Sequence, residues 1–141
     1  MKHFSRCAIF LMLLPLVLAS CRALAQALHA ALSGRPKSAI LAAARLPDSL
    51  SGNAAALGAP AALAAALQSF DRAASFREAV LAAANLGGNS DVVAAVCGAI
   101  AGAHYSAEAI PALWRDSLLQ RHRLEGFADR LLAHALLGLG A

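Results

Sequence analysis

Two helices are predicted to meet at the stretch Asn85-Leu86-Gly87-Gly88-Asn89-Ser90-Asp91-Val92-Val93, which runs directly into an apolar segment that ends at Tyr105. The glycine pair ends the first helix, because glycine adopts the backbone conformations that follow a helix C-terminus. Ser90 or Asp91 caps the second helix, since both side chains accept hydrogen bonds from exposed backbone N–H groups. Carboxylate, amide and hydroxyl groups therefore converge on a tight turn, which makes this turn the candidate functional site.

The composition predicts an all-α fold. Of the 141 residues, 60% are hydrophobic and only 5% are aromatic, and much of the apolar share is alanine. Alanine is the strongest helix former because its side chain loses no entropy in a helix. Strand-like alternation and repeats of fixed period are not visible. We therefore expect one compact multi-helix domain with closely packed helices and an alanine-lined core.

The charge distribution argues against a nucleic-acid partner. The formal net charge is +4, but two of the basic residues, Lys2 and Arg6, lie at the very start of the chain. Near the C-terminus, basic and acidic side chains are interleaved, which is typical of a solvated surface and not of a stripe that follows phosphates. These residues are Arg115, Asp116, Arg121, Arg123, Glu125, Asp129 and Arg130.

Residues 1–25 have the pattern of a secretory signal peptide. They combine a basic start, an apolar run from Cys7 to Ala19 and a small-x-small cleavage site at Ala23-Leu24-Ala25. The stretch Leu18-Ala19-Ser20-Cys21 also matches a bacterial lipoprotein box, which would lipidate Cys21. The apolar run is too short for a membrane span.

The other interpretation of this region is a core helix over Val17–Leu32. Pro15 would lie just before its first turn, where proline is tolerated. Cleavage after Ala25 would divide this helix, so we expect a cytoplasmic protein, with export or lipidation as the alternative. Apolar side chains recur at three- and four-residue spacing and predict the stripe that faces the core. They are Leu18, Cys21, Leu24, Ala25, Leu28 and Leu32.

Turn residues and caps predict the remaining helices. Gly34 ends the first helix, and residues 46–60 are rich in proline, glycine, serine and asparagine and therefore form a loop. Proline or a capping box opens the later helices that begin before residue 120, and apolar spacing predicts the last one. The predicted helices cover residues 36–45, 60–70, 76–86, 111–120 and 124–137. In the last of these, Leu124, Phe127, Leu131 and Ala135 form the predicted apolar side.

The residues of the turn, taken by themselves, allow two interpretations. Asp91 is an ordinary N-terminal cap, and Gly87 an ordinary helix stop, so the stretch could be a plain linker. As a ligand site, the helix N-terminus would bind an anion such as a pyrophosphate, and the glycines would let it approach the backbone. A carboxylate beside amide and hydroxyl oxygens suits Mg²⁺ or Mn²⁺ better than zinc.

A resemblance to a known family is carried by the segment Ser75-Phe76-Arg77-Glu78-Ala79-Val80-Leu81-Ala82-Ala83-Ala84-Asn85-Leu86-Gly87-Gly88 and its continuation to His104-Tyr105. The similarity extends through Glu108-Ala109-Ile110-Pro111 and Trp114 to Ala128-Asp129-Arg130-Leu131-Leu132. These residues resemble the C-terminal part of ADP-ribosylglycohydrolases of the dinitrogen-reductase-activating type.

The resemblance implies an all-α hydrolase that cleaves the glycosidic bond between ADP-ribose and a modified side chain. Two Mg²⁺ or Mn²⁺ ions in such enzymes orient the ribose and the attacking water. By resemblance, Asp91 and Asn89 are metal ligands, and Gly87, Gly88 and Ser90 line the ADP-ribose phosphates. The implied partner is ADP-ribose or an ADP-ribosylated protein, and no residue is assigned a catalytic role.

The turn departs from the family pattern, which is Asp-x-Asp followed by Thr or Ser. Asn89 stands at the first Asp position and Val92 at the hydroxyl position. The paired acidic element of the family's N-terminal region is not found in the sequence. We therefore expect residues 14–141 to form a partial domain of this family behind an atypical or signal-like N-terminus at 1–13, truncated and weak or inactive as a lone chain.

Two alternatives from other classes remain. The first is a non-catalytic helical interaction module that pairs with itself or with a separate N-terminal half. An apolar cleft wall left exposed by the missing acidic half would favour such association. The second alternative is a small exported or lipidated helical protein, which residues 1–25 alone support.

Overall fold

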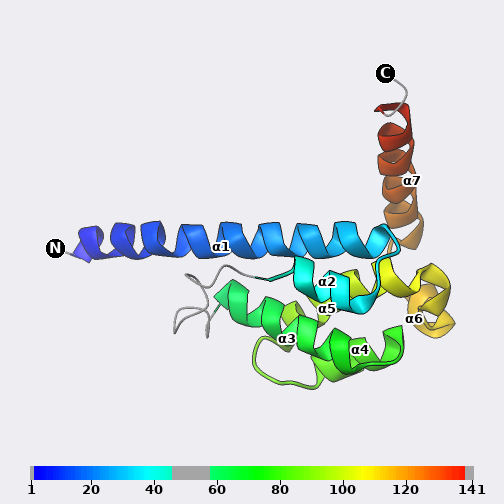
Figure 1. Cartoon of the computed structure of the whole chain (residues 1–141), viewed down its shortest axis with the longest axis horizontal. Helices are drawn as coiled ribbons and strands as arrows, with labels where there is room; N and C mark the ends of the chain where they lie inside the picture. Colours follow the sequence, from blue (N-terminus) through cyan, green and yellow to red (C-terminus); the bar gives the residue numbers. More distant parts are fainter. Residues whose placement is uncertain (1, 46–57, 139–141) are drawn as a thin grey trace. The chain divides into compact units, whose positions relative to one another are not determined.

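The structure, a computed structural model, describes residues 2–45 and 58–138, with side chains described from Leu14 onward. Figure 1 shows helices throughout these ranges, and no strand occurs within them. The predicted all-α fold is therefore confirmed. The helices are α1 (Lys2–Leu32), α2 (Lys37–Ala43), α3 (Gly58–Arg72), α4 (Phe76–Ala84), α5 (Ser90–Tyr105), the 3-10 turn η3 (Ala107–Ala109), α6 (Ala112–Asp116) and α7 (Arg121–Gly138).

The chain divides into two compact units, Met1–Ala109 and Ile110–Ala141. In the first unit, α3, α4 and α5 pack on one another, and α1 packs against α2, α3 and α5. Its largest fully buried side chains are Phe70, Ile40, Ile100 and Cys97. Alanines fill much of the remaining core, as the composition predicts. Those without any exposed surface are Ala27, Ala66, Ala79, Ala83 and Ala101.

The residues of α1 that face the core are not those of the predicted apolar stripe. Leu18, Cys21, Ala25 and Leu32 are exposed, so their predicted place in the core is wrong. The inward side consists mainly of small residues, because small side chains let α2, α3 and α5 approach the α1 backbone closely. The larger side chains are left on the flanks of this contact. The buried residues of α1 are Leu16, Ser20, Ala23, Ala27 and Ala31.

Pro15 also lies inside α1 and not before its first turn, because the helix begins at Lys2. Among the described residues, only the Leu14–Leu32 part of α1 is long and apolar enough to cross a membrane. Core helices of soluble proteins and N-terminal signal sequences meet the same criterion, so this is weak evidence for a span.

Local capping explains the helix ends of the first unit. At the end of α1, Gly34 has a φ of 68°, and the N–H groups of Gly34 and Arg35 donate to the carbonyls of Ala31 and Ala30, both at 3.0 Å. This is a Schellman motif, as the predicted glycine stop requires. At the start of α4, the N–H of Glu78 donates to Ser75 Oγ at 3.2 Å, which confirms the predicted cap. The predicted loop at 46–60 lies, up to residue 57, outside the described residues.

The second unit is less regular than predicted. α6 ends at Asp116, although the sequence predicts a helix as far as Gln120. Gln120 has a φ of 63°, which a continuous helix does not permit, and α7 begins one residue later. Arg121 joins the two helices, because its guanidinium contacts Asp116 Oδ1 at 2.8 Å and Glu125 Oε1 at 2.6 Å.

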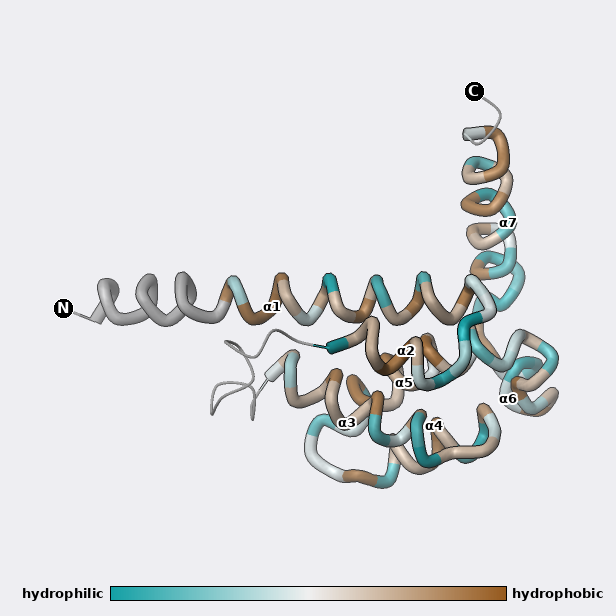
Figure 2. The backbone as a smooth tube through the Cα atoms, viewed as in Figure 1, coloured by the Kyte–Doolittle hydropathy of each residue, from teal (hydrophilic) through white to brown (hydrophobic). Residues whose placement is uncertain are grey.

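No side chain of α7 is buried. Its predicted apolar side is nevertheless present, since Leu124, Phe127 and Leu131 are at least half exposed in a row along the helix. Figure 2 shows hydrophobic segments alternating with hydrophilic ones along the α7 tube. The unit thus carries an apolar helix surface that its own residues do not cover.

Candidate functional site

The candidate site is the turn between α4 and α5. The C-cap of α4 is Asn85, whose backbone N–H and side-chain amide both donate to the carbonyl of Leu81, at 3.1 and 2.8 Å. Gly87 and Gly88 follow with φ angles of 76° and 60°, which residues with a Cβ rarely adopt. Two successive left-handed residues reverse the chain within the turn, so the start of α5 lies close to the end of α4. The glycine pair therefore has the role that the sequence predicts.

The predicted cap of α5 is wrong by one or two residues. The N-cap is Asn89, whose carbonyl accepts the N–H of Val93 at 3.1 Å, and its side chain makes no capping hydrogen bond. Ser90 and Asp91 are the first two residues of the helix. Asp91 still lies in the first turn, where the helix dipole favours a negative charge. Asn89, Ser90 and Asp91 all favour N-cap positions, so local preference does not select among them.

A pocket of about 310 Å³ lies beside this turn. Gly87, Asn89 and Val93 line it from the turn and α5, and Gly58 and Ala65 line it from α3. Of the five predicted site residues, the pocket lining thus includes Gly87 and Asn89. It does not include Gly88, Ser90 or Asp91.

Sequence reasoning missed the α3 side of this pocket. Its alanines and glycine carry no chemical signal in the sequence, and only packing places them opposite the turn. The full lining also contains Ala61, Ala62 and Leu86.

Val92 points into a different pocket. This smaller pocket, of about 110 Å³, lies between α1, α3 and α5 and is almost entirely apolar. Its lining residues are Ser20, Cys21, Leu24, Ala59, Ala62, Leu63, Val92 and Val96. Val92 and Asn89 therefore lie on different sides of the α5 N-terminus.

The residues around the turn do not fit a site with two metal ions. Within the described residues no group of three His, Cys, Asp or Glu side chains is placed to hold a metal ion. Glu78 accepts the N–H of Ala74 at 2.9 Å, and Glu108 accepts Ser106 Oγ, so both carboxylates have local structural roles. The remaining candidate metal ligands at the turn are the carboxylate of Asp91 and the neutral amide of Asn89. Together they carry one negative charge. A site for two divalent ions needs several carboxylates.

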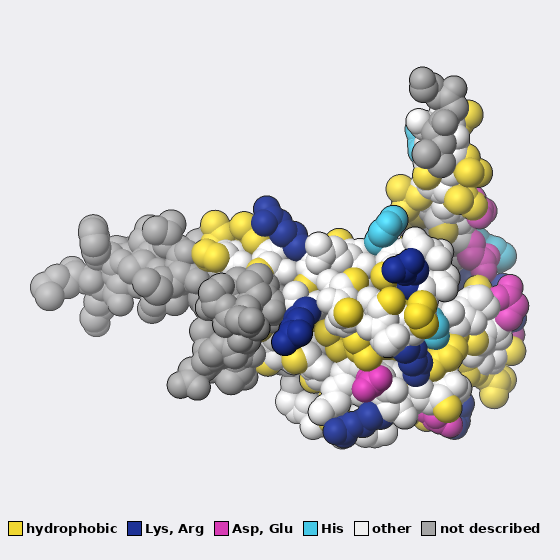
Figure 3. Space-filling model, viewed as in Figure 1, with side chains coloured by type: hydrophobic (Ala, Val, Ile, Leu, Met, Phe, Trp, Pro, Cys, Tyr) yellow, Lys and Arg dark blue, Asp and Glu magenta, His cyan; other side chains and the backbone are white. Residues whose placement is uncertain are grey.

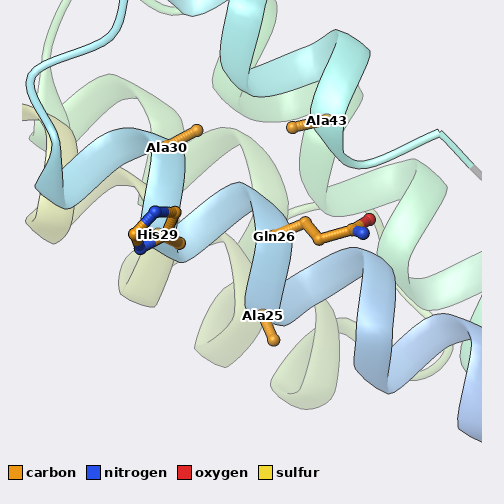
Figure 4. Close-up of a pocket in the computed structure, with 5 residues that line it drawn as sticks. All are labelled: Ala25, Gln26, His29, Ala30 and Ala43. Atoms are coloured by element: carbon orange, nitrogen blue, oxygen red, sulfur yellow. The ribbon is translucent and has the colours of Figure 1, made fainter.

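Another pocket of the first unit lies away from this turn. It has a volume of about 520 Å³ and lies between α1 and α2, lined by Ala25, Gln26, His29, Ala30 and Ala43 (Figure 4). Gln26 and His29 are its only side chains with hydrogen-bonding groups, and the rest of its lining is alanine. It therefore lacks the carboxylate and glycine chemistry of the α4–α5 turn, which remains the candidate site.

Comparisons with known proteins agree with the fold. A family model described as ADP-ribosylglycohydrolase matches residues 10–138. ADP-ribosylarginine hydrolase Tri1 of Serratia proteamaculans (strain 568) is 48% identical over 56 residues, which are 40% of this chain and 15% of that protein. An uncharacterized protein of Archaeoglobus fulgidus is 45% identical over 56 residues, which are 40% of this chain and 18% of that protein.

A solved structure described as an ADP-ribosylglycohydrolase-related protein complex is also similar. It matches with a TM-score of 0.66 and 40% sequence identity, over 75% of this chain and 43% of that one. The chain thus matches less than half the length of each of these three proteins.

Proposed function

Because the chain belongs to the ADP-ribosylglycohydrolase family, we propose that its α4–α5 turn binds the ADP-ribose group of an ADP-ribosylated substrate. The observation that carries the proposal is the pair of left-handed glycines directly before the N-terminus of α5. Such a turn presents backbone N–H groups to an anion at the positive end of the helix dipole. Gly87, Gly88 and Ser90 would contact the phosphates.

Asp91 and Asn89 are proposed as a partial ligand set for one Mg²⁺ or Mn²⁺ ion. Both residues offer hard oxygen ligands at the start of the same helix. When bound, a divalent ion would supply charge neutralisation at the ribose and phosphates. Within the described residues no group of three His, Cys, Asp or Glu side chains is placed to hold a metal ion. We therefore propose that the lone chain binds ADP-ribose but hydrolyses the glycosidic bond weakly or not at all.

Calorimetric titration of the purified chain with ADP-ribose, with and without millimolar Mg²⁺, tests this proposal. We expect binding in the millimolar range that Mg²⁺ strengthens and that Asp91→Asn weakens. The matched control is Asp129→Asn, which removes an exposed carboxylate of α7 and leaves binding unchanged. The double variant Asn89→Asp/Val92→Thr introduces the family's ligand pattern, and Mg²⁺-dependent affinity should rise at least several-fold.

The absence of heat for wild type and for the double variant at millimolar ligand would remove the binding proposal. If Asp91→Asn gives the same binding signal as wild type, the proposal of ADP-ribose binding stands. The proposed metal ligands are then wrong. Thermal shift with the same ligands gives an independent readout, because a ligand that binds the folded state raises its stability.

A second candidate function is a non-catalytic interaction module. The exposed apolar side chains of α7 favour it, because contiguous apolar patches on soluble proteins mark interaction sites. In this case we expect concentration-dependent association of the chain. Size-exclusion chromatography with light scattering checks it, and a monomer across the micromolar range would count against self-association.

A further inference from the structure

The charged side chains of α7 lie in separate rows on the helix surface, although they are interleaved in the sequence. Residues four apart follow one another along one side of a helix. Figure 3 shows acidic side chains beside hydrophobic ones at the visible base of α7. Only the first of two neighbouring rows contains carboxylates. The first row consists of Arg121, Glu125 and Asp129, and the second consists of His122, Gly126 and Arg130.

The cation of the first row is neutralised inside the second unit. The guanidinium of Arg121 contacts Glu125 Oε1 at 2.6 Å and Asp116 Oδ1 at 2.8 Å. The other oxygen of Glu125 lies 3.9 Å from Nδ1 of His122, at the border between the two rows. The charge of Arg121 is therefore already matched by carboxylates of the same unit.

Arg123 and Arg130 have only neutral partners. Arg123 donates from Nη1 to Gln120 Oε1 at 3.1 Å, and Arg130 donates from Nε to the carbonyl of Gly126 at 3.3 Å. The guanidinium of Arg130 also lies 4.6 Å from the centre of the Phe127 ring. Within the part of the chain that the structure describes, neither arginine forms an ion pair. Each guanidinium is thus oriented by one contact and keeps its charge and further N–H donors for a ligand.

These side chains line a pocket on α7 with a volume of about 310 Å³, here called the basic hollow. None of its lining residues is acidic. The planar N–H fork of arginine matches the geometry of phosphate oxygens, which makes arginine the preferred side chain for binding phosphate. The lining of the basic hollow consists of His122, Arg123, Gly126, Phe127 and Arg130.

Gly126 gives a second, independent indication of a ligand. It lies inside α7, where glycine is the least favourable residue after proline. Its φ is not among the positive ones, and a Cβ added there would have no atom within 4 Å. Neither the backbone nor the packing of the second unit therefore requires a glycine at this position. A glycine does let a ligand approach the helix backbone closely.

We propose that the basic hollow binds the phosphate group of a phosphorylated small molecule. Arg123 and Arg130 would donate hydrogen bonds to the phosphate oxygens, and His122 would add a further donor at the edge. Gly126 would leave space for the phosphate, and the half-exposed ring of Phe127 would contact the rest of the molecule. The proposed site belongs to the second unit and does not depend on the function proposed for the α4–α5 turn.

Calorimetric titration of the full chain with pyrophosphate tests this proposal. The titration is done at about 0.15 M salt, where attraction between distant exposed charges is screened. Arg123→Gln and Arg130→Gln should each weaken binding roughly tenfold, because each removes a charge-assisted hydrogen bond. The matched control is Arg77→Gln, which removes the same charge from an exposed position of α4 and should leave the affinity unchanged.

Gly126→Ala separates ligand binding from stability without changing any charge. Alanine is the better helix former, so this variant should raise the thermal stability of the free chain. It should nevertheless weaken pyrophosphate binding roughly fivefold, because its methyl group takes up space beside the phosphate. Gly98→Ala, inside α5, is the matched control and should leave binding unchanged. A more stable protein that binds less tightly cannot be explained by misfolding.

Nuclear magnetic resonance of the arginine Nε–H groups shows where the ligand binds. The resonances of Arg123 and Arg130 should shift during the titration, and that of Arg77 should not. Affinity that is equal in wild type, Arg130→Gln and Gly126→Ala would overturn the proposal, as would no binding at millimolar pyrophosphate. Binding only of phosphatidylglycerol vesicles or only of an oligonucleotide would also overturn it, because the occupant would then be a membrane or a nucleic acid.

The same variants distinguish this site from the α4–α5 turn. ADP-ribose binding that Asp91→Asn weakens and Gly126→Ala leaves unchanged belongs to the turn. Pyrophosphate binding that Gly126→Ala weakens and Asp91→Asn leaves unchanged belongs to the basic hollow. The second result would stand even if the turn bound no ADP-ribose, so the two proposals can fail separately.

Discussion

The ammonium group of Lys37 donates a hydrogen bond to the carbonyl oxygen of Phe70 at 2.9 Å and lies 4.8 Å from the centre of the same residue's ring. It also donates to the carbonyl of Ala73, which accepts the hydroxyl of Tyr105 at 3.1 Å. Lys37 begins α2, Phe70 lies near the end of α3, and Tyr105 ends α5. One cation thus satisfies backbone carbonyls at the negative end of α3 and joins three helices.

Lys37→Met should therefore destabilise the first unit by about 2 kcal/mol, since part-buried carbonyls lose a charged donor while the aliphatic stem is kept. Urea unfolding monitored by circular dichroism measures this change. Arg45→Met, at an exposed residue just after α2, is the matched control and should change the midpoint little. Equal midpoints for the two variants would show that Lys37 has no such role.

Alanine should have opposite effects at Gly88 and Gly98. Gly88 has a φ of 60°, and a Cβ added there would have no atom within 4 Å, so Gly88→Ala should cost about 1 kcal/mol through backbone strain without any clash. Gly98 lies inside α5, and a Cβ there would meet Val80 Cγ2 at an ordinary 3.7 Å. Gly98→Ala should stabilise the unit by roughly 0.5–1 kcal/mol.

The same unfolding experiment measures both glycine variants. Gly88→Asn provides a further comparison, because asparagine tolerates the left-handed conformation better than alanine. A Gly88→Ala protein as stable as wild type would contradict the left-handed turn.

The stability of the first unit should fall as the pH is lowered from 7.5 to 5. Burial, with a smaller contribution from the charge of Lys37, lowers the pKa of His104 below its usual 6.5. The unfolded chain therefore takes up a proton at His104 before the folded chain does. The stabilisation is complete above pH 6.5 and is lost as the pH falls from 6.5 through the folded-state pKa.

Urea midpoints at pH 5, 6.5 and 7.5 check this dependence, with His104→Gln as the test variant. The ring of His104 packs edge-on to that of Phe70 at 5.4 Å, so the variant should be less stable at pH 7.5 and less dependent on pH. His134→Gln, on the exposed surface of α7, is the control. An unchanged pH dependence in His104→Gln would assign the effect to another group.

The N-terminal part of α1 should remain attached to the protein. Cleavage after Ala25 would remove Leu16, Ser20 and Ala23, which are buried in the first unit. Loss of these contacts would expose the facing surfaces of α3 and α5, so the cleaved chain should be far less stable. N-terminal sequencing checks this, and a mature protein that starts at Gln26 or at a lipidated Cys21 would favour export.

Several helix boundaries and the α4–α5 turn could be predicted from the local chemistry of the sequence. Ser75 with Glu78, Gly34, and Gly87 with Gly88 act within a few residues of themselves through capping hydrogen bonds and left-handed φ angles. Their effects were therefore predictable without knowledge of any distant contact. The α5 cap is the exception, because Asn89, Ser90 and Asp91 are all good capping residues and only the path of the turn selects among them.

Local preferences were enough to predict an all-α chain with helix ends at its glycines, prolines and capping residues. They could not determine which side of α1 faces the core. That side was selected in the folded unit, where Ala23 and Ala27 allow the neighbouring helices a close approach that the larger Leu18 and Leu32 side chains would prevent. The pocket beside the turn arose in the same way, because only packing brings Ala61 and Ala65 of α3 opposite Gly87 and Asn89.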